Sequence, residues 1–229
     1  MDRDAAKQAA GERAATFVQD GMCLGLGTGS TTAYALDAIA RRVQDENLDV
    51  RGVPTSFAAE RRARRLGLPL TSLDTDPDLD LAFDGADEVD DAMRLIKGRG
   101  AAHTREKVVA TQADRFVVLI DPTKQVDQIG SERVLPVEVL PMAASPVQRR
   151  LEDWGASASL RMGESKDGPT VTDQGFWILD ARFPNGIDAP AELNNALNAT
   201  PGVLDHGLFL DLATDVLVGQ PDGSVHHHS

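Results

Sequence analysis

Short apolar runs alternate with helix-length segments along the first half of the chain, and this alternation is the feature that most constrains the fold. We expect strands at 22–27, 50–54, 79–83 and 116–120, with helices at 4–19, 30–44, 56–66 and 102–112. Strands that alternate with helices through short loops form a mostly parallel sheet with helices on both faces. The sequence therefore predicts an open, Rossmann-like α/β domain, whose ligands bind at the carboxyl ends of the strands.

The pattern changes near residue 134, which indicates a second, smaller domain. We expect strands at 134–139, 157–163, 176–182 and 202–210, with helices at 145–154 and 189–198. This βαββαβ order is typical of a ferredoxin-like α+β domain with a mixed sheet, and a last strand at 213–218 is expected to return to the first domain. The predicted division is an α/β domain of residues 1–130 and 211–220, a smaller domain of residues 131–210, and a tail of residues 221–229 without function.

The charge of the chain excludes several classes of partner. Its 229 residues carry a formal net charge of −13, whereas nucleic acids and anionic membranes are bound through basic surfaces. No apolar run reaches the roughly 18 residues that span a bilayer, and the N-terminus lacks the apolar core of a signal peptide. The single cysteine, Cys23, excludes an internal disulfide. We therefore expect a cytoplasmic protein that binds neither nucleic acid nor membrane.

Lysine is scarce among the basic residues. Of the 23 Lys and Arg residues only five are Lys, and Lys97, Lys107 and Lys124 lie within one short stretch. An acidic excess with few lysines is typical of a cytoplasm with molar salt, where acidic surfaces help to maintain solubility. We favour this halophilic interpretation over a codon bias toward arginine. The lysines that remain suggest a need for a compact, strongly hydrated charge.

A glycine-rich turn, G-L-G-T-G-S-T-T at residues 25–32, follows the first predicted strand. Glycines let the backbone approach a ligand, and the free N–H groups at the start of the next helix attract anions. Thr28, Ser30 and Thr31 add hydroxyl groups, and Ser30 to Thr32 can cap the helix. The turn suits a phosphate, although a plain strand–helix turn needs no ligand. It completes neither the dinucleotide fingerprint nor the P-loop motif.

Carboxylates follow the predicted strand at 79–83, in the sequence D-G-A-D-E at residues 84–88. They can orient the hydroxyl groups of a sugar, hold a metal, or form a solvated turn. A metal site would need further His or carboxylate ligands at a suitable spacing. No such cluster stands out nearby, so we expect no metal site here.

A third polar segment, residues 97–107, reads K-G-R-G-A-A-H-T-R-E-K. Lys97 lies on a glycine-rich loop, and Glu106 lies in the first turns of the helix that follows. A carboxylate with positive groups nearby suits proton transfer beside a carbonyl group. The same residues can also form only a charged helix face.

Together these segments resemble the metal-free type A ribose-5-phosphate isomerases. The matching sequences are G-x-G-T-G-S-T at 25–31, D-G-A-D-E at 84–88, L-I-K-G at 95–98, T-R-E-K at 104–107, F-V-V-L-I-D-x-x-K at 116–124 and L-P-V-E-V at 135–139. The resemblance implies a two-domain, cofactor-free α/β isomerase that interconverts D-ribose 5-phosphate and D-ribulose 5-phosphate in non-oxidative pentose phosphate metabolism. It also implies a homodimer or homotetramer with a sugar phosphate as its small-molecule partner.

The resemblance further implies roles for individual residues. Glu106 is the expected base, which transfers a proton through an enediolate intermediate, and Asp84, Asp87 and Lys97 are the other expected catalytic residues. The implied substrate-binding residues are Thr28, Gly29, Ser30, Thr31, Asp84, Gly85, Ala86, Asp87, Lys97, Gly98, Arg99, Gly100 and Lys124.

Two positions depart from the family pattern. Glycine usually stands where this chain has Arg99, whose side chain can cover the substrate phosphate or point to solvent. An apolar residue usually stands at the position of His103. We expect His103 to be a tolerated residue at the surface or behind the catalytic groups, and not a second base.

Three other functions share part of the pattern. A non-catalytic sugar-phosphate sensor would keep the phosphate loop and lose Glu106 and Lys97, which are both present. A nucleotide-dependent oxidoreductase would use the G-x-G at residues 25–27, but the rest of its fingerprint is missing. A CoA-transferase-like enzyme would use Glu106 as a nucleophile, and a covalent thioester would reveal it.

Overall fold

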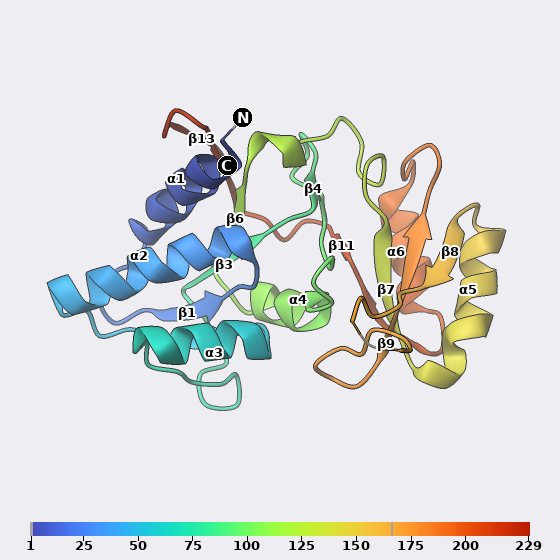
Figure 1. Ribbon diagram of the computed structural model, residues 1–229, viewed down its shortest axis with the longest axis horizontal. Helices are drawn as coiled ribbons and strands as arrows, with labels where there is room; N and C mark the ends of the chain where they lie inside the picture. Colours follow the sequence, from blue (N-terminus) through green and yellow to red (C-terminus); the bar gives the residue numbers. More distant parts are fainter. Residues whose placement is uncertain (1, 166) are drawn as a thin grey trace. The chain divides into compact units, whose positions relative to one another are not determined.

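Five parallel strands and one antiparallel strand form the main sheet (Figure 1). The computed structural model describes residues 2–165 and 167–229. The strands of this sheet are β1 (Cys23–Leu26), β2 (Arg51–Pro54), β3 (Leu81–Gly85), β6 (Phe116–Ile120), β12 (Asp215–Gly219) and β13 (Val225–His228), in the order β13-β12-β6-β3-β1-β2. Only β13 runs antiparallel to its neighbour, so the prediction of an open, mostly parallel sheet is confirmed.

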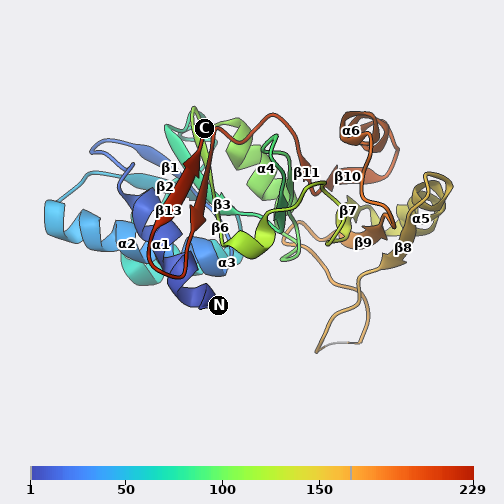
Figure 2. The ribbon, with the colours of Figure 1, turned by 90° about the horizontal axis from the view of Figure 1, so that it is seen from above.

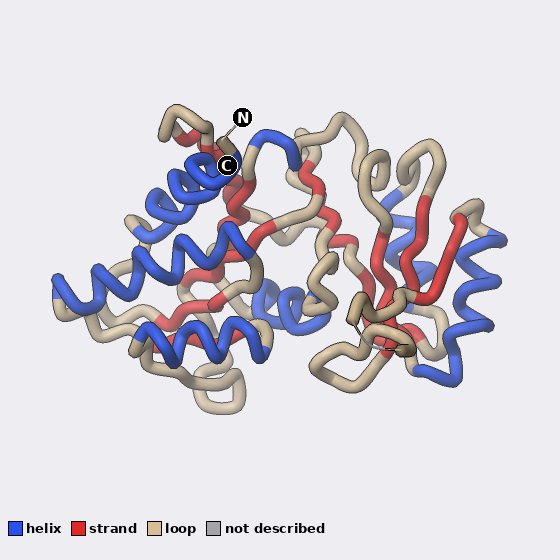
Figure 3. The backbone as a smooth tube through the Cα atoms, viewed as in Figure 1, coloured by secondary structure: helices blue, strands red, loops and turns tan. Residues whose placement is uncertain are grey.

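Helices cover both faces of this sheet, as predicted. They are α1 (Arg3–Ala15), α2 (Ser30–Glu46), α3 (Phe57–Leu66) and α4 (His103–Thr111), with a short 3₁₀ helix, η1 (Pro122–Lys124) (Figure 3). Leu24 and Leu26 of β1 share one apolar cluster with residues of α1, α2 and α3. Gly25, which points to the opposite face, lies so close to α4 that an added Cβ would be 2.6 Å from the side chain of Val109.

Local signals explain where these helices begin and end. The carboxylate of Asp2 accepts hydrogen bonds from the first N–H groups of α1, and the hydroxyl of Ser56 accepts one from the N–H of Ala59 in α3. Gly67 ends α3 with a φ of 73°, a backbone conformation that favours glycine. The first helix ends at Ala15, short of the predicted residue 19.

A separate antiparallel sheet has the predicted βαββαβ order. Its elements are β7 (Leu135–Val139), α5 (Ala144–Asp153), β8 (Ser157–Leu160), β9 (Trp177–Arg182), α6 (Pro190–Asn198) and β10 (Val203–His206), with a 3₁₀ turn, η2 (Pro141–Ala143), between β7 and α5. The strand order β10-β7-β9-β8, antiparallel throughout, is that of a ferredoxin-like domain. The prediction of a mixed sheet is therefore wrong in this detail. An apolar core of its own lies between this sheet and its helices.

A small third sheet was not predicted. It consists of β4 (Glu88–Val89), β5 (Leu95–Ile96) and β11 (Leu208–Phe209). The single strand predicted at 202–210 is in fact two strands, β10 and β11, that pair in different sheets. They separate at Gly207, where an added Cβ would lie 2.2 Å from the carbonyl oxygen of Lys97.

The chain folds into two compact units, whose limits differ from the predicted ones. The first contains the residues up to 86, residues 105–124 and residues 212–229, and the second contains residues 87–104 and 125–211. Residues 87–104 belong to the second unit because β5 pairs with β11. The predicted tail is also part of the fold, because β13 pairs with β12 along the sheet edge (Figure 2). In the part of the chain that the structure describes, no helix has the length and apolar character to cross a membrane.

Candidate active site

The glycine-rich turn lies between β1 and α2, and its geometry requires glycine at two positions. A Cβ added to Gly27 would lie 2.1 Å from the carbonyl oxygen of Phe83 and 2.6 Å from Oδ1 of Asp84, so no other residue fits. Gly29 has a φ of 118° and is the N-cap of α2, which has no side-chain cap. Ser30 is therefore the first helical residue and not the predicted cap. The first N–H groups of this 17-residue helix therefore have no acceptor from an N-cap side chain and lie beside exposed Gly29 and Ser30.

Hydrogen bonds hold this turn against the end of β3. The N–H of Thr28 donates to Oδ1 of Asp84 at 3.1 Å, and the N–H of Gly85 donates to the same oxygen at 2.8 Å. The hydroxyl of Thr28 lies 2.8 Å from that of Thr55 and 2.7 Å from that of Ser56. The structure thus brings Thr28 and Asp84 together, as the sequence predicted. Thr55 and Ser56 were missed, although their place directly after β2 could have marked them.

Lys124 lies at the carboxyl end of β6, next to β3 in the sheet. The buried carboxylate of Asp121 lies beside it. Burial by itself would raise the pKa of Asp121, but hydrogen bonds from Thr123 and the charges of Arg3 and Lys124 lower that pKa overall. Because β6, β3 and β1 are adjacent, Lys124, Asp84 and the glycine turn all lie at the carboxyl ends of neighbouring strands.

Glu106 is a buried carboxylate in the first turn of α4. Its exposed fraction is 7 %, which largely separates the side chain from water. From residue 105 on, this helix belongs to the first unit. The close approach of Gly25 in β1 to Val109 keeps α4, and with it Glu106, close to the sheet.

In the second unit, Lys97 is buried directly after β5, with an exposed fraction of 3 %. Its N–H donates to the carbonyl of Gly207 at 2.9 Å. Its ammonium nitrogen lies 5.4 Å from the centre of the Phe209 ring, an arrangement that stabilises a cation. This lysine is thus held inside the structure and is not a mobile surface charge.

The loop after Lys97 folds back on the acidic segment. Gly98 has a φ of 105°, and an added Cβ would lie 2.7 Å from Nδ1 of His103. The N–H of Arg99 donates to Oδ2 of Asp87 at 2.9 Å. The structure therefore brings Asp87 and the loop of residues 97–100 together, with Arg99 and Gly100 exposed.

His103 is completely buried, so a place at the surface is excluded. Its Nε2 lies 4.0 Å from Oε2 of Glu138, a buried residue of β7. The hydroxyl groups of Thr104 and Thr172 donate to the two carboxylate oxygens of Glu138. Burial raises the pKa of Glu138, against the lowering effect of these hydrogen bonds. His103 thus packs behind the glycine loop, as part of a buried polar cluster.

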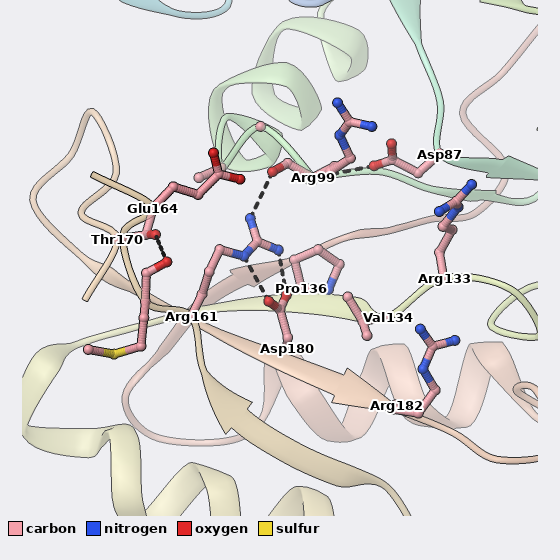
Figure 4. Close-up of a pocket in the computed structure, with 13 residues that line it drawn as sticks. Asp87, Arg99, Arg133, Val134, Pro136, Arg161, Glu164, Thr170, Asp180 and Arg182 are labelled. Atoms are coloured by element: carbon pink, nitrogen blue, oxygen red, sulfur yellow. Dashed lines mark hydrogen bonds and ion pairs between the residues drawn. The ribbon is translucent and has the colours of Figure 1, made fainter. Parts of the chain in front are cut away.

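Arg161 and Asp180 support the same loop and were missed by the sequence analysis. Arg161 donates from Nη1 to the carbonyl of Gly98 at 2.9 Å and to that of Arg99 at 3.0 Å. Its Nε and Nη2 donate to the two carboxylate oxygens of Asp180 (Figure 4). Nothing in the sequence marks this pair, because it lies more than 60 residues beyond the loop.

Glu88, the last residue of the acidic segment, has a structural role. Its buried carboxylate accepts hydrogen bonds from the N–H groups of Gly130, Glu132 and Arg133. Among the residues that the structure describes, no group of three or more His, Cys, Asp or Glu residues is arranged to hold a metal ion.

These features define a class of protein: an α/β protein with a glycine-rich turn and buried carboxylates at strand ends of the first unit and a buried lysine after a strand of the second. The family model of ribose 5-phosphate isomerase A (phosphoriboisomerase A) matches residues 51–223. The isomerase A of Gloeothece citriformis is 54% identical over 93% of this chain and 90% of its own. That of Haloarcula marismortui is also 54% identical, over 96% and 94% of the two chains.

A solved structure of a D-ribose-5-phosphate isomerase in complex with phospho-erythronic acid is also similar. It superimposes with a TM-score of 0.96 and 41% identity, and the match covers 100% of this chain and 99% of that one. The chain belongs to the ribose 5-phosphate isomerase A family. It is an isomerase that interconverts ribose 5-phosphate and ribulose 5-phosphate, which decides against the sensor, oxidoreductase and CoA-transferase alternatives.

Proposed function

We propose that Glu106 is the base of this isomerisation and that the reaction passes through an enediolate. The observation that carries the proposal is the burial of Glu106 in the first turn of α4, inside the segment that resembles the family. A carboxylate shielded from water can remove the proton from C2 of the open-chain aldose and return it to C1. Triosephosphate isomerase, which also converts an aldose phosphate into a ketose phosphate, uses a glutamate as its base.

Lys97 is the group that we assign to the developing negative charge. When the C2 proton leaves, the electron pair forms the C1–C2 double bond and negative charge moves to the former carbonyl oxygen, O1. The ketose forms when the hydroxyl proton on O2 is transferred to O1 and C1 receives the carbon-bound proton. A positive charge fixed in a site of low water content stabilises such an oxyanion far better than a mobile surface charge.

We assign the substrate phosphate to the turn of residues 28–31, with Lys124 nearby in the first unit. The N–H groups at the start of α2, which no N-cap side chain caps, are a suitable phosphate site. The complex of the related isomerase with phospho-erythronic acid shows that a family member binds a phosphorylated sugar acid. A local site of this kind is needed because a net charge of −13 repels an anion at long range.

Asp84 and Asp87 are assigned to the sugar hydroxyl groups, with backbone groups of Gly85, Ala86 and the loop of residues 98–100. Each aspartate also accepts a backbone hydrogen bond, from Thr28 for Asp84 and from Arg99 for Asp87. The two carboxylates therefore also fix the loops to which they belong.

Ketose formation from D-ribose 5-phosphate, measured with EDTA present, tests the assignment of the base. Glu106→Gln is expected to lower kcat by at least about 100-fold, the usual contribution of a general base. Asp114→Asn is the matched control, because Asp114 is an exposed carboxylate shortly after the same helix. Turnover that survives Glu106→Gln in a folded protein would transfer the role to another group, with Asp84, Asp87 and His103 tested next.

Two further predictions accompany this proposal. The family resemblance implies a homodimer or homotetramer, which light scattering of the purified protein would test. The single cysteine predicts a reducing compartment such as the cytoplasm, which cell fractionation would test.

A further inference from the structure

A cavity of about 450 Å³ in the second unit carries an unusual charge pattern (Figure 4). Four of its lining residues are arginines: Arg99, Arg133, Arg161 and Arg182. They come from separate segments, namely the loop after β5, the approach to β7, the end of β8 and the end of β9. In a chain with a net charge of −13, this convergence of positive side chains needs an explanation.

Three of the four arginines are not neutralised by an ion pair within the described part of the chain. Arg161 is neutralised by its bidentate pair with Asp180. Among the residues that the structure describes, the guanidinium groups of Arg99, Arg133 and Arg182 form no ion pair. With Asp87 and Glu164 also in the lining, the cavity carries a net charge of +1, and its positive charge lies where these three side chains meet it.

The backbones that carry these arginines are fixed. The N–H of Arg133 is bound by the carboxylate of Glu88, and Arg182 lies in β9, paired with Ser157 of β8. Arg99 is held by Asp87 at its N–H and by Arg161 at its carbonyl. Only the side chains would have to be ordered on binding, which lowers the entropic cost of forming the complex.

The remaining polar groups indicate what kind of anion fits. Arginine forks match phosphate oxygens through paired hydrogen bonds. The carboxylate of Glu164 lines the same cavity and can accept hydrogen bonds from hydroxyl groups, whereas Asp87, which also lines it, is assigned to the substrate. The described lining contains no aromatic residue on which a nucleobase would stack, so a nucleotide is not favoured. The volume suits a small organic ligand.

We propose that this cavity, which borders the candidate active site at Asp87 and the loop of residues 99–100, binds a small sugar ester with two phosphate groups at its arginines. Arg133 and Arg182 provide the phosphate contacts together with the side chain of Arg99, while Glu164 accepts hydrogen bonds from the sugar. An occupant would contact the loop that also carries Lys97, so this is a place where an anionic effector can act on the isomerase.

Calorimetric titration with D-fructose 1,6-bisphosphate as the probe tests the proposal. The equilibrium mixture of ribose 5-phosphate and ribulose 5-phosphate is kept saturating throughout, so that the substrate-phosphate turn is occupied. The probe is expected to bind with one site per chain, and the double variant Arg133→Gln/Arg182→Gln to weaken it by at least about 30-fold, the loss of two charged contacts. The exposed helix residue Arg149 gives the matched control, Arg149→Gln, with unchanged affinity.

Three results would overturn the proposal. The first is that the wild-type protein shows no detectable binding of the bisphosphate. The second is that the wild type and the folded double variant bind it equally tightly. The third is that Arg149→Gln loses as much affinity as the double variant. Inorganic phosphate is titrated in the same way, and binding as tight as that of the bisphosphate would refute the two-phosphate ligand class. The isomerase activity of the double variant serves as its check of folding, because neither arginine is assigned to the reaction.

Discussion

Replacing Arg161 by methionine should weaken catalysis without any direct contact between this residue and the substrate. The change removes four hydrogen bonds: two to the carboxylate of Asp180 and two to the carbonyls of Gly98 and Arg99. The loop of residues 97–100 is assigned to the substrate site. Its carbonyls would lose the donor that fixes their direction.

The magnitude follows from the two bonds to the loop. A hydrogen bond from a charged donor contributes about 1.5–3 kcal/mol. The Arg161 side chain is 15% exposed, so water can replace part of this loss. A net loss of about 1–3 kcal/mol corresponds to a decrease of roughly 5- to 150-fold in kcat/KM.

Steady-state kinetics of Arg161→Met, Arg161→Lys and Asp180→Asn would check this reasoning, with circular dichroism to confirm folding. Lysine cannot bridge two carbonyls and a carboxylate at once, so Arg161→Lys should recover little. Because the pair acts as a unit, the double variant Arg161→Met/Asp180→Asn should be no worse than Arg161→Met. A folded Arg161→Met with kcat/KM within about twofold of wild type, or additive losses in the double variant, would refute the reasoning.

Four other outcomes are expected. Burial raises the pKa of Glu138 above its ordinary 4.5, so the folded chain favours the protonated side chain. The contribution of protonated Glu138 to stability is complete at low pH and is lost as pH rises through the raised pKa. Glu138→Gln should therefore flatten the decline of the melting temperature above about pH 5, and an unchanged slope would contradict this. The pH dependence of Asp215 is the opposite, because its hydrogen bond with Arg115 lowers its pKa. The contribution of ionised Asp215 to stability is therefore present above pH 3.8 and is lost as pH falls through the lowered pKa. Asp215→Asn should cost about 1–3 kcal/mol in denaturant unfolding at neutral pH, discounted because Arg115 is partly exposed. Gly27→Ala would place a Cβ 2.1 Å from the carbonyl of Phe83, so a lower melting temperature and loss of turnover are expected, and normal kinetics would show that the turn can move. Activity should persist in molar KCl, where the Debye length is only ~3 Å, and a loss with the fold intact would count against a salt-adapted surface.

The parallel sheet was predictable because its strands are short, apolar and separated by helices. Strands such as Phe116–Ile120, buried on both sides, leave a continuous apolar run in the sequence. The two-residue strands Glu88–Val89 and Leu95–Ile96 leave no such pattern. The limit between the units was misplaced for that reason, since residues 87–104 join the second unit through these strands.

Parts of the candidate site were predictable where function requires an unusual local sequence. The glycine-rich turn and the D-G-A-D-E segment each have a plain structural explanation, but both directly follow predicted strands, and the structure brings Gly27 and Asp84 together. The support of the site was not predictable from the sequence. Arg161 reaches the loop of residues 97–100 only because the chain folds, and His103 is buried against a glutamate 35 positions further along the chain.

The two backbone hydrogen bonds of Gly207 couple the local unfolding of two sheets in the second unit. Its N–H donates to the carbonyl of Pro136 at 2.8 Å, and its carbonyl accepts from the N–H of Lys97 at 2.9 Å. One peptide segment therefore fastens β7 of the larger antiparallel sheet to the end of β5 in the smaller one. The amide protons of Lys97 and Gly207 should exchange with solvent in a single cooperative event, at the rate set by the opening of both sheets. The backbone of Lys97 therefore belongs to the slowly exchanging part of the fold, and its position does not depend on bound substrate.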